Sequence, residues 1–191
     1  IPRPMVFRVH DEPSEDKLER FREFALRFGH YFKAQKGRAI AKEMNKLLGT
    51  IQGRPEHNAI TTLAVRSMAK AVYTTDNIGH YGLAFPYYTH FTSPIRRYPD
   101  MMVHRLLASY LNGAKSADKR YLEQLAVHST EREIIASDAE RASIKYKMAE
   151  FMKDRIGEEF EGVVSGLTDW GVYVELDDTH VEGMAFLRDI D

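Results

Sequence analysis

Apolar residues recur at helical spacing through most of the chain and alternate with polar residues near its end. In residues 14–29 they fall every three or four positions. Ser14 and two acidic residues before them suit the start of a helix, and Gly29 suits its end. The same spacing predicts four further helices, over residues 40–49, 55–71, 99–113 and 116–155.

The last of these helices is long, and its apolar positions predict which face is directed at the core. The residues on that face are Leu122, Leu125, Ile134, Ile135, Ala139, Ala142, Tyr146 and Met148. An interruption near His128 and Ser129 is a second interpretation of the same pattern.

Other parts of the chain lack helical spacing. Residues 1–10 are expected to be extended, because their prolines disfavour a helix. Residues 73–98 are rich in Gly, Pro, Thr, His and aromatic residues, which indicates either an ordinary surface loop or a functional one. Near the end, alternation predicts the opening strands of a small antiparallel barrel, within residues 160–165, within 172–176 and from 183.

These patterns predict an α+β fold with a mainly helical part over residues 1–155 and a short β part over 156–191. The chain has 191 residues, no cysteine and a net charge of −1, which excludes disulfides, zinc thiolate sites and a strongly basic nucleic-acid arm. No apolar run approaches the roughly 18 residues that span a bilayer, so we expect no membrane partner. The absence of cysteine fits a reducing compartment, so we expect a cytoplasmic location. Because the chain starts at Ile1 and stops at Asp191, we expect a piece of a longer polypeptide.

The most informative chemistry lies in residues 76–105. Arg96 and Arg97 are adjacent, Thr92 and Ser93 offer hydroxyl groups, and histidines and aromatic residues are interleaved with them. Guanidinium groups suit bidentate phosphate contacts, and aromatic rings suit single-stranded bases. An arginine pair beside aromatic rings is also typical of a purely structural corner, so composition leaves both interpretations open.

The run NIGHYGLAFPYYTHFTSPIRRYPDMMVHRLL (residues 77–107) resembles the C-terminal half of the catalytic, or RNB, domain of the bacterial RNase II / RNase R family, and its RNase R branch more closely. The segments FRVHDEPSEDKL and AVRSMAKAVY resemble the same branch. After them, IGEEFEGVVSGLTDWGVYVELDDTHVEGMAFLRDI resembles the start of an S1 RNA-binding domain, which is an OB-fold barrel.

This resemblance implies part of a 3′-to-5′ hydrolytic exoribonuclease that degrades single-stranded RNA to nucleoside 5′-monophosphates. It places Arg96 at the position of the family's catalytic arginine and Glu140 near the terminal nucleotides; an ordinary solvated acid is the other interpretation of Glu140. Arg97, Thr92 and Ser93 are expected either to contact the RNA backbone or to support the loop, and His80 and Tyr81 to shape the floor of the RNA channel. Trp170 and Tyr173 are expected to stack on bases; in the other interpretation at least one aromatic residue of these strands fills the barrel interior.

The resemblance also implies Mg²⁺ held by an aspartate cluster that lies upstream of Ile1. The acids of this chain do not replace that cluster: Asp76 and Asp100 are expected to be isolated, and no metal ligand is named. We therefore expect this chain to be inactive alone and the intact protein to be a monomer acting on single-stranded RNA. A non-catalytic RNA-binding relative that keeps the RNA channel and the S1 domain is the alternative.

Overall fold

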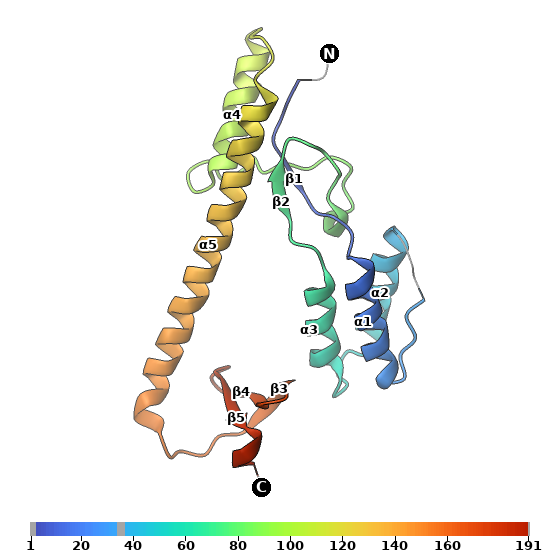
Figure 1. Ribbon diagram of the computed structural model, residues 1–191, viewed down its shortest axis with the longest axis vertical. Helices are drawn as coiled ribbons and strands as arrows, with labels where there is room; N and C mark the ends of the chain where they lie inside the picture. The colour runs from blue at the N-terminus through green and yellow to red at the C-terminus, as the bar shows by residue number, and fades with distance from the viewer. Residues whose placement is uncertain (1–2, 34–36, 191) are drawn as a thin grey trace.

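The computed structural model describes residues 3–33 and 37–190, and these residues form an α+β arrangement of five α-helices and two small antiparallel sheets. A cluster of three helices lies on one side, a long helix runs along the other, and a three-stranded sheet lies near the end of that long helix (Figure 1). Residues 1 and 2 of the predicted extended segment lie outside the described residues, and its later part contains β1 (Phe7–Val9).

The three-helix cluster consists of α1 (Glu15–Arg27), α2 (Arg38–Thr50) and α3 (His57–Ser67), which share one apolar core. The buried residues of α1 are spaced three and four apart, as in an amphipathic helix. The core side chains are Leu18, Phe21, Ala25, Phe32, Ile40, Met44, Leu47, Ile51, Ile60 and Ala64. The helices predicted over residues 14–29 and 40–49 are confirmed to within two residues at each end.

The third helix is shorter than its sequence pattern indicated. α3 ends at Ser67, so the prediction of a helix through Ala71 is wrong for the last four residues. The backbone becomes extended at Met68, and β2 (Val72–Thr74) pairs antiparallel with β1. Local periodicity does not reveal this strand, because its partner lies more than sixty residues earlier in the chain.

The two-stranded sheet packs against α4 (Tyr98–Leu111) and α5 (Lys119–Met152). A second core joins them, formed by Val6, Tyr73, Met102, Val103, Leu106, Leu122 and Ala126. The helix predicted at 99–113 is confirmed. α5 runs without a break through Ser129, whose hydroxyl donates to the Leu125 carbonyl, so the interruption considered near that residue is wrong.

Most of α5 beyond its first third is exposed, and the predicted inward face is wrong there. Leu122 is buried and Leu125 half-buried, but Ile134, Ile135 and Tyr146 are 40%, 52% and 67% exposed. The described part of the chain places little against this stretch of α5, which stands apart from the three-helix cluster (Figure 1). Although α5 is long, no helix in residues 3–33 and 37–190 combines the length and apolar character needed to cross a membrane.

The C-terminal sheet has the order β3 (Gly162–Leu167), β4 (Gly171–Leu176), β5 (Glu182–Phe186), and both pairings are antiparallel. The predicted strands are therefore confirmed, with the first displaced by about two residues. Gly171 is required by close approach, because a Cβ atom there would lie 2.4 Å from the Ala185 carbonyl oxygen.

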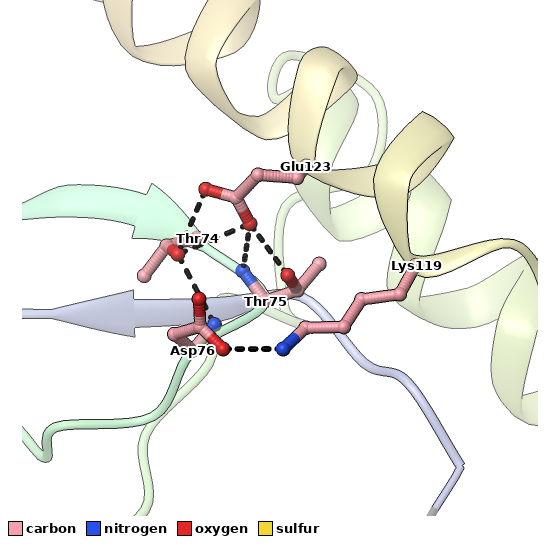
Figure 2. A network of polar contacts seen from close by, with 5 residues as sticks. All are labelled: Thr74, Thr75, Asp76, Lys119 and Glu123. Carbon is pink, nitrogen blue, oxygen red and sulfur yellow. Dashed lines mark hydrogen bonds and ion pairs between the residues drawn. The ribbon is translucent and has the colours of Figure 1, made fainter.

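A carboxylate from α5 fastens this helix to the end of β2 (Figure 2). Glu123 accepts hydrogen bonds from the Thr75 backbone N–H at 2.6 Å, from the Thr75 hydroxyl at 2.5 Å and from the Thr74 hydroxyl at 2.9 Å. Burial raises the pKa of Glu123, but these hydrogen bonds outweigh burial and leave the pKa below its ordinary value. The neighbouring ion pair of Lys119 with Asp76 is exposed and therefore contributes little to stability.

Replacing Glu123 with alanine should weaken this junction, because the Thr75 N–H and two hydroxyls lose their acceptor. We expect the protein to lose about 2 kcal/mol of stability, measured by thermal unfolding followed by circular dichroism. Gln124→Ala on the adjacent exposed position is the matched control and should leave the midpoint unchanged. Equal midpoints for the two variants would contradict the role of this network.

Candidate active site

Arg96 lies on a tight turn immediately before α4. The Ser93 carbonyl accepts hydrogen bonds from the backbone N–H groups of Arg96 at 3.2 Å and Arg97 at 3.0 Å, which closes the turn. The Arg96 side chain is exposed and has no hydrogen-bond or ion-pair partner in the described part of the chain. Its neighbour Ile95 is 100% exposed. The turn therefore presents one free guanidinium group to the solvent.

Asp100, in the first turn of α4, is buried beneath this loop and makes hydrogen bonds to two of its residues. Its side chain is 0% exposed, and Oδ2 accepts the Ser93 backbone N–H at 2.7 Å and an Arg97 guanidinium N–H at 2.9 Å. Burial raises the pKa of Asp100, but the two hydrogen bonds and the positive charge of Arg97 outweigh it and leave the pKa below its ordinary value. Asp100 is therefore paired with a backbone donor and a cation, and neither partner is a second carboxylate.

Some of the remaining loop residues have hydrogen-bond or ion-pair partners, and others do not. The guanidinium of Arg97 is committed to Asp100, which favours support of the loop over direct contact with a ligand. Thr92 is exposed without a hydrogen bond in the described chain, and Ser93 is half-buried. The ring of His104 stacks on Phe91 with centroids 4.0 Å apart, and its Nε2 is 2.7 Å from the Phe91 carbonyl oxygen.

A chain of aromatic rings connects this loop with the loop that carries His80. Successive ring centroids lie 5.1 to 5.7 Å apart along the series His10, His80, Tyr88, His90 and Tyr73. The Tyr73 hydroxyl lies 2.7 Å from His90 Nδ1, within hydrogen-bonding distance. The two histidine-containing loops therefore form one packed unit.

His80 and Tyr81 themselves make internal contacts. The backbone N–H of His80 donates to the Phe85 carbonyl, and that of Tyr81 donates to His10. The Tyr81 hydroxyl points to the Gly37 carbonyl at 3.3 Å, on the side of the three-helix cluster. An open hollow beside them is lined by residues 10–12, 77–81 and 84–87. In the described part of the chain, the ring contacts between His80 and His90 run through Tyr88.

Arg8 ties the sheet to α5 close to the same unit. Its guanidinium stacks over the Tyr73 ring at 4.5 Å and makes two hydrogen bonds, of 2.6 and 3.2 Å, to Glu133. Glu140 lies seven residues beyond Glu133 on the same face of α5, and it is exposed. Among the described residues Glu140 has no partner, so the structure does not bring it into contact with Arg96.

Tyr173 lies on β4, and Trp170 directly precedes that strand. The three-stranded sheet lies near the end of α5 (Figure 1). Trp170 is 76% exposed, and Tyr173 is half-buried opposite Met184 of β5. Together with Phe186 these side chains line an open hollow on the sheet. Such a surface can stack on bases, but the described chain does not join it to Arg96.

The residues that are present do not fit a magnesium site. Within residues 3–33 and 37–190, no group of three or more His, Asp or Glu side chains could hold a metal ion. Among the described residues the fully buried carboxylate is that of Asp100, and it is already paired with Ser93 and Arg97.

Sequence reasoning missed the groups that support the loop. Asp100, His90, Tyr73, Arg8 and Glu133 were not predicted as site residues. One signal was available for Asp100: Arg97 and Asp100 are three residues apart across the start of a predicted helix, a spacing that allows an ion pair. The contacts of Arg8 with Tyr73 and Glu133 join distant parts of the chain and leave no local signal.

Residues 1–113 match the RNB domain family, and the chain belongs to that family. Within it, the chain is homologous to bacterial ribonuclease R. It is 42% identical over 184 residues to ribonuclease R of Aquifex aeolicus, an alignment that covers 95% of this chain and 26% of that protein. The chain spans about a quarter of the length of the curated relatives that it matches.

Solved structures agree with this relationship. The apo form of Mycoplasma genitalium RNase R superimposes with a TM-score of 0.84 at 27% identity, covering 95% of this chain and 29% of that one. The same protein in complex with ribose-methylated single-stranded RNA gives a TM-score of 0.83 at 28% identity, with the same coverage.

The environment of His90 predicts a dependence of stability on pH. Burial lowers the pKa of His90 below its ordinary value of 6.5, and the charges of Arg97 and Arg8 lower it further. The unfolded state therefore binds a proton before the folded state does, and stability falls as pH drops through about 6.5. This histidine contributes a slope of at most about 1.4 kcal/mol per pH unit.

His90→Gln should flatten the decline in stability between pH 7 and pH 5, measured by unfolding midpoints across that range. His128→Gln, at an exposed position on α5, is the matched control and should leave the decline unchanged. An identical pH profile for wild type and His90→Gln would contradict this assignment.

Proposed function

We propose that this chain supplies the arginine-bearing part of the active site in a 3′-to-5′ hydrolytic exoribonuclease that degrades single-stranded RNA to nucleoside 5′-monophosphates. The observation that carries the proposal is the free Arg96 guanidinium, presented on a loop that Asp100 clamps from behind, in a chain homologous to ribonuclease R. Binding of single-stranded RNA by M. genitalium RNase R supports the same class of substrate.

Arg96 is the proposed catalytic residue. A guanidinium group held beside the scissile phosphate neutralises the charge that develops on the phosphoryl oxygens as the bond to the leaving oxygen breaks. The start of α4 adds the positive end of a helix dipole next to the same turn. Thr92 supplies a free hydroxyl for a phosphate oxygen, while Arg97 and Ser93 support the loop.

The residues outside the loop have roles that follow the family resemblance. Glu140 is placed near the terminal nucleotides, and its exposed position on α5 keeps it available to a ligand. His80 and Tyr81 shape the RNA channel through the packed rings that reach His90. Trp170 and Tyr173 stack on bases further along the RNA, supported by their place in the open hollow of the sheet.

We assign residues 1–155 to the C-terminal part of the RNB catalytic domain and residues 156–191 to the first strands of an S1 domain. The antiparallel order β3-β4-β5, with an aromatic hollow on it, supports the second assignment. Magnesium is expected to be held by aspartates upstream of this chain, since residues 3–33 and 37–190 do not form a metal site. The intact protein is proposed to act as a monomer.

In the intact protein, Arg96→Ala should lower the turnover of single-stranded RNA by roughly 10²-fold or more, because one donor to the developing charge is lost. Release of nucleoside 5′-monophosphates in single-turnover reactions measures this effect. Arg20→Ala, which removes an exposed arginine from α1, is the matched control and should leave turnover unchanged. Turnover that survives Arg96→Ala contradicts the proposed function, and RNA binding without hydrolysis by the wild type supports a non-catalytic relative.

The 191-residue chain by itself should release no nucleotides from single-stranded RNA in magnesium, since the aspartates proposed to hold the metal lie upstream of it. The measurement compares the purified chain, checked for helical content by circular dichroism, with the intact protein in the same buffer. Robust magnesium-dependent hydrolysis by the chain alone would show that its own residues complete the active site.

A further inference from the structure

The burial of Asp100 is the starting point of a further inference. Its carboxylate has no exposed surface, and one oxygen, Oδ2, receives both hydrogen bonds that the described chain provides. The other oxygen, Oδ1, and the Nε atom of Arg97 are buried and have no hydrogen-bond partner among the described residues. An ionised carboxylate in such a place costs several kcal/mol unless it is well paired.

The two groups that Asp100 holds lie on either side of Arg96. Ser93 precedes Arg96 by three residues and Arg97 follows it directly, so one carboxylate fixes both ends of the turn that carries the free guanidinium. The nearby tether from His104 holds Phe91, before the turn begins, and therefore does not replace this clamp.

The ion pair of Asp100 with Arg97 makes the two adjacent arginines electrostatically different. The Arg97 guanidinium is neutralised by Asp100, whereas the Arg96 guanidinium has no carboxylate partner in the described chain. Of the two adjacent cations, only Arg96 therefore offers an uncompensated charge to an RNA phosphate.

We propose that Asp100 is a positioning residue, which orients the Arg96 guanidinium by fixing the Ser93–Arg97 turn. Because Asp100 also neutralises Arg97, Arg96 is the cation that binds the RNA phosphate. This inference rests on the proposed function and deepens it. A positioning role differs from a purely structural role of Asp100 in one respect: its effect on turnover depends on the presence of Arg96.

A double-mutant cycle in the intact protein tests that dependence. Asp100→Asn keeps the shape of the side chain and removes its charge, so we expect kcat to fall roughly tenfold or more, as displaced catalytic groups do. In the Arg96→Ala background the same substitution should lower kcat by less than about twofold. An equal loss in both backgrounds, or no loss in either, overturns the proposal.

Glu123→Gln is the matched control for this cycle. Glu123 also accepts a backbone N–H and hydroxyl groups, but it does so at the junction of α5 with β2 (Figure 2). Below its unfolding temperature this variant should give the same kcat as its parent in both backgrounds. A coupling of Glu123 to Arg96 as large as that of Asp100 overturns a specific positioning role.

A second pair of variants covers the case in which Asp100→Asn does not fold. Arg97→Lys keeps a cation beside Asp100 and should retain kcat within about threefold, whereas Arg97→Gln should lose tenfold or more only when Arg96 is present. If Arg97→Gln lowers kcat equally without Arg96, Arg97 acts on the RNA directly and the proposal is wrong. Failure of the proposed function looks different, because Arg96→Ala alone then leaves turnover intact.

Discussion

The carboxylate of Asp100 is the constraint on which the candidate site depends. It lies fully buried at the start of α4 and has to remain paired, because an ionised carboxylate without partners is not tolerated in an apolar interior. Its partners are the backbone of Ser93 and the guanidinium of Arg97, so satisfying this one charge also fixes the backbone around Arg96. Stability and presentation of the free arginine are therefore coupled in a single contact.

Two carboxylates of α5 hold other parts of the chain in the same way. Glu123 fixes the end of β2, and Glu133 holds Arg8, which stacks on Tyr73. Tyr73 in turn meets His90 at the base of the Arg96 loop. α5 thus holds β2 and Arg8, and its exposed later part leads to the three-stranded sheet (Figure 1).

The elements that could be predicted from the sequence are those that depend on the local spacing of apolar residues. The apolar spacing in residues 14–29 and 99–113 was sufficient, because those faces meet partners that lie within the described chain. β2 was missed because its pairing with β1 is non-local, and the predicted inward face of α5 failed because periodicity does not say whether a partner is present. The resemblance pointed to Arg96, but nothing in the motif indicated that Asp100 is fully buried, because burial depends on packing that a local pattern does not encode.

The most direct measurement is a structure of the intact protein with an uncleaved single-stranded RNA bound. We expect the Arg96 guanidinium to lie about 2.7–2.9 Å from oxygens of a phosphate near the 3′ end, with the Ser93 N–H still bonded to Asp100. A structure in which the RNA phosphates are held by other groups, and Arg96 is turned to solvent or paired with a protein carboxylate, would contradict it.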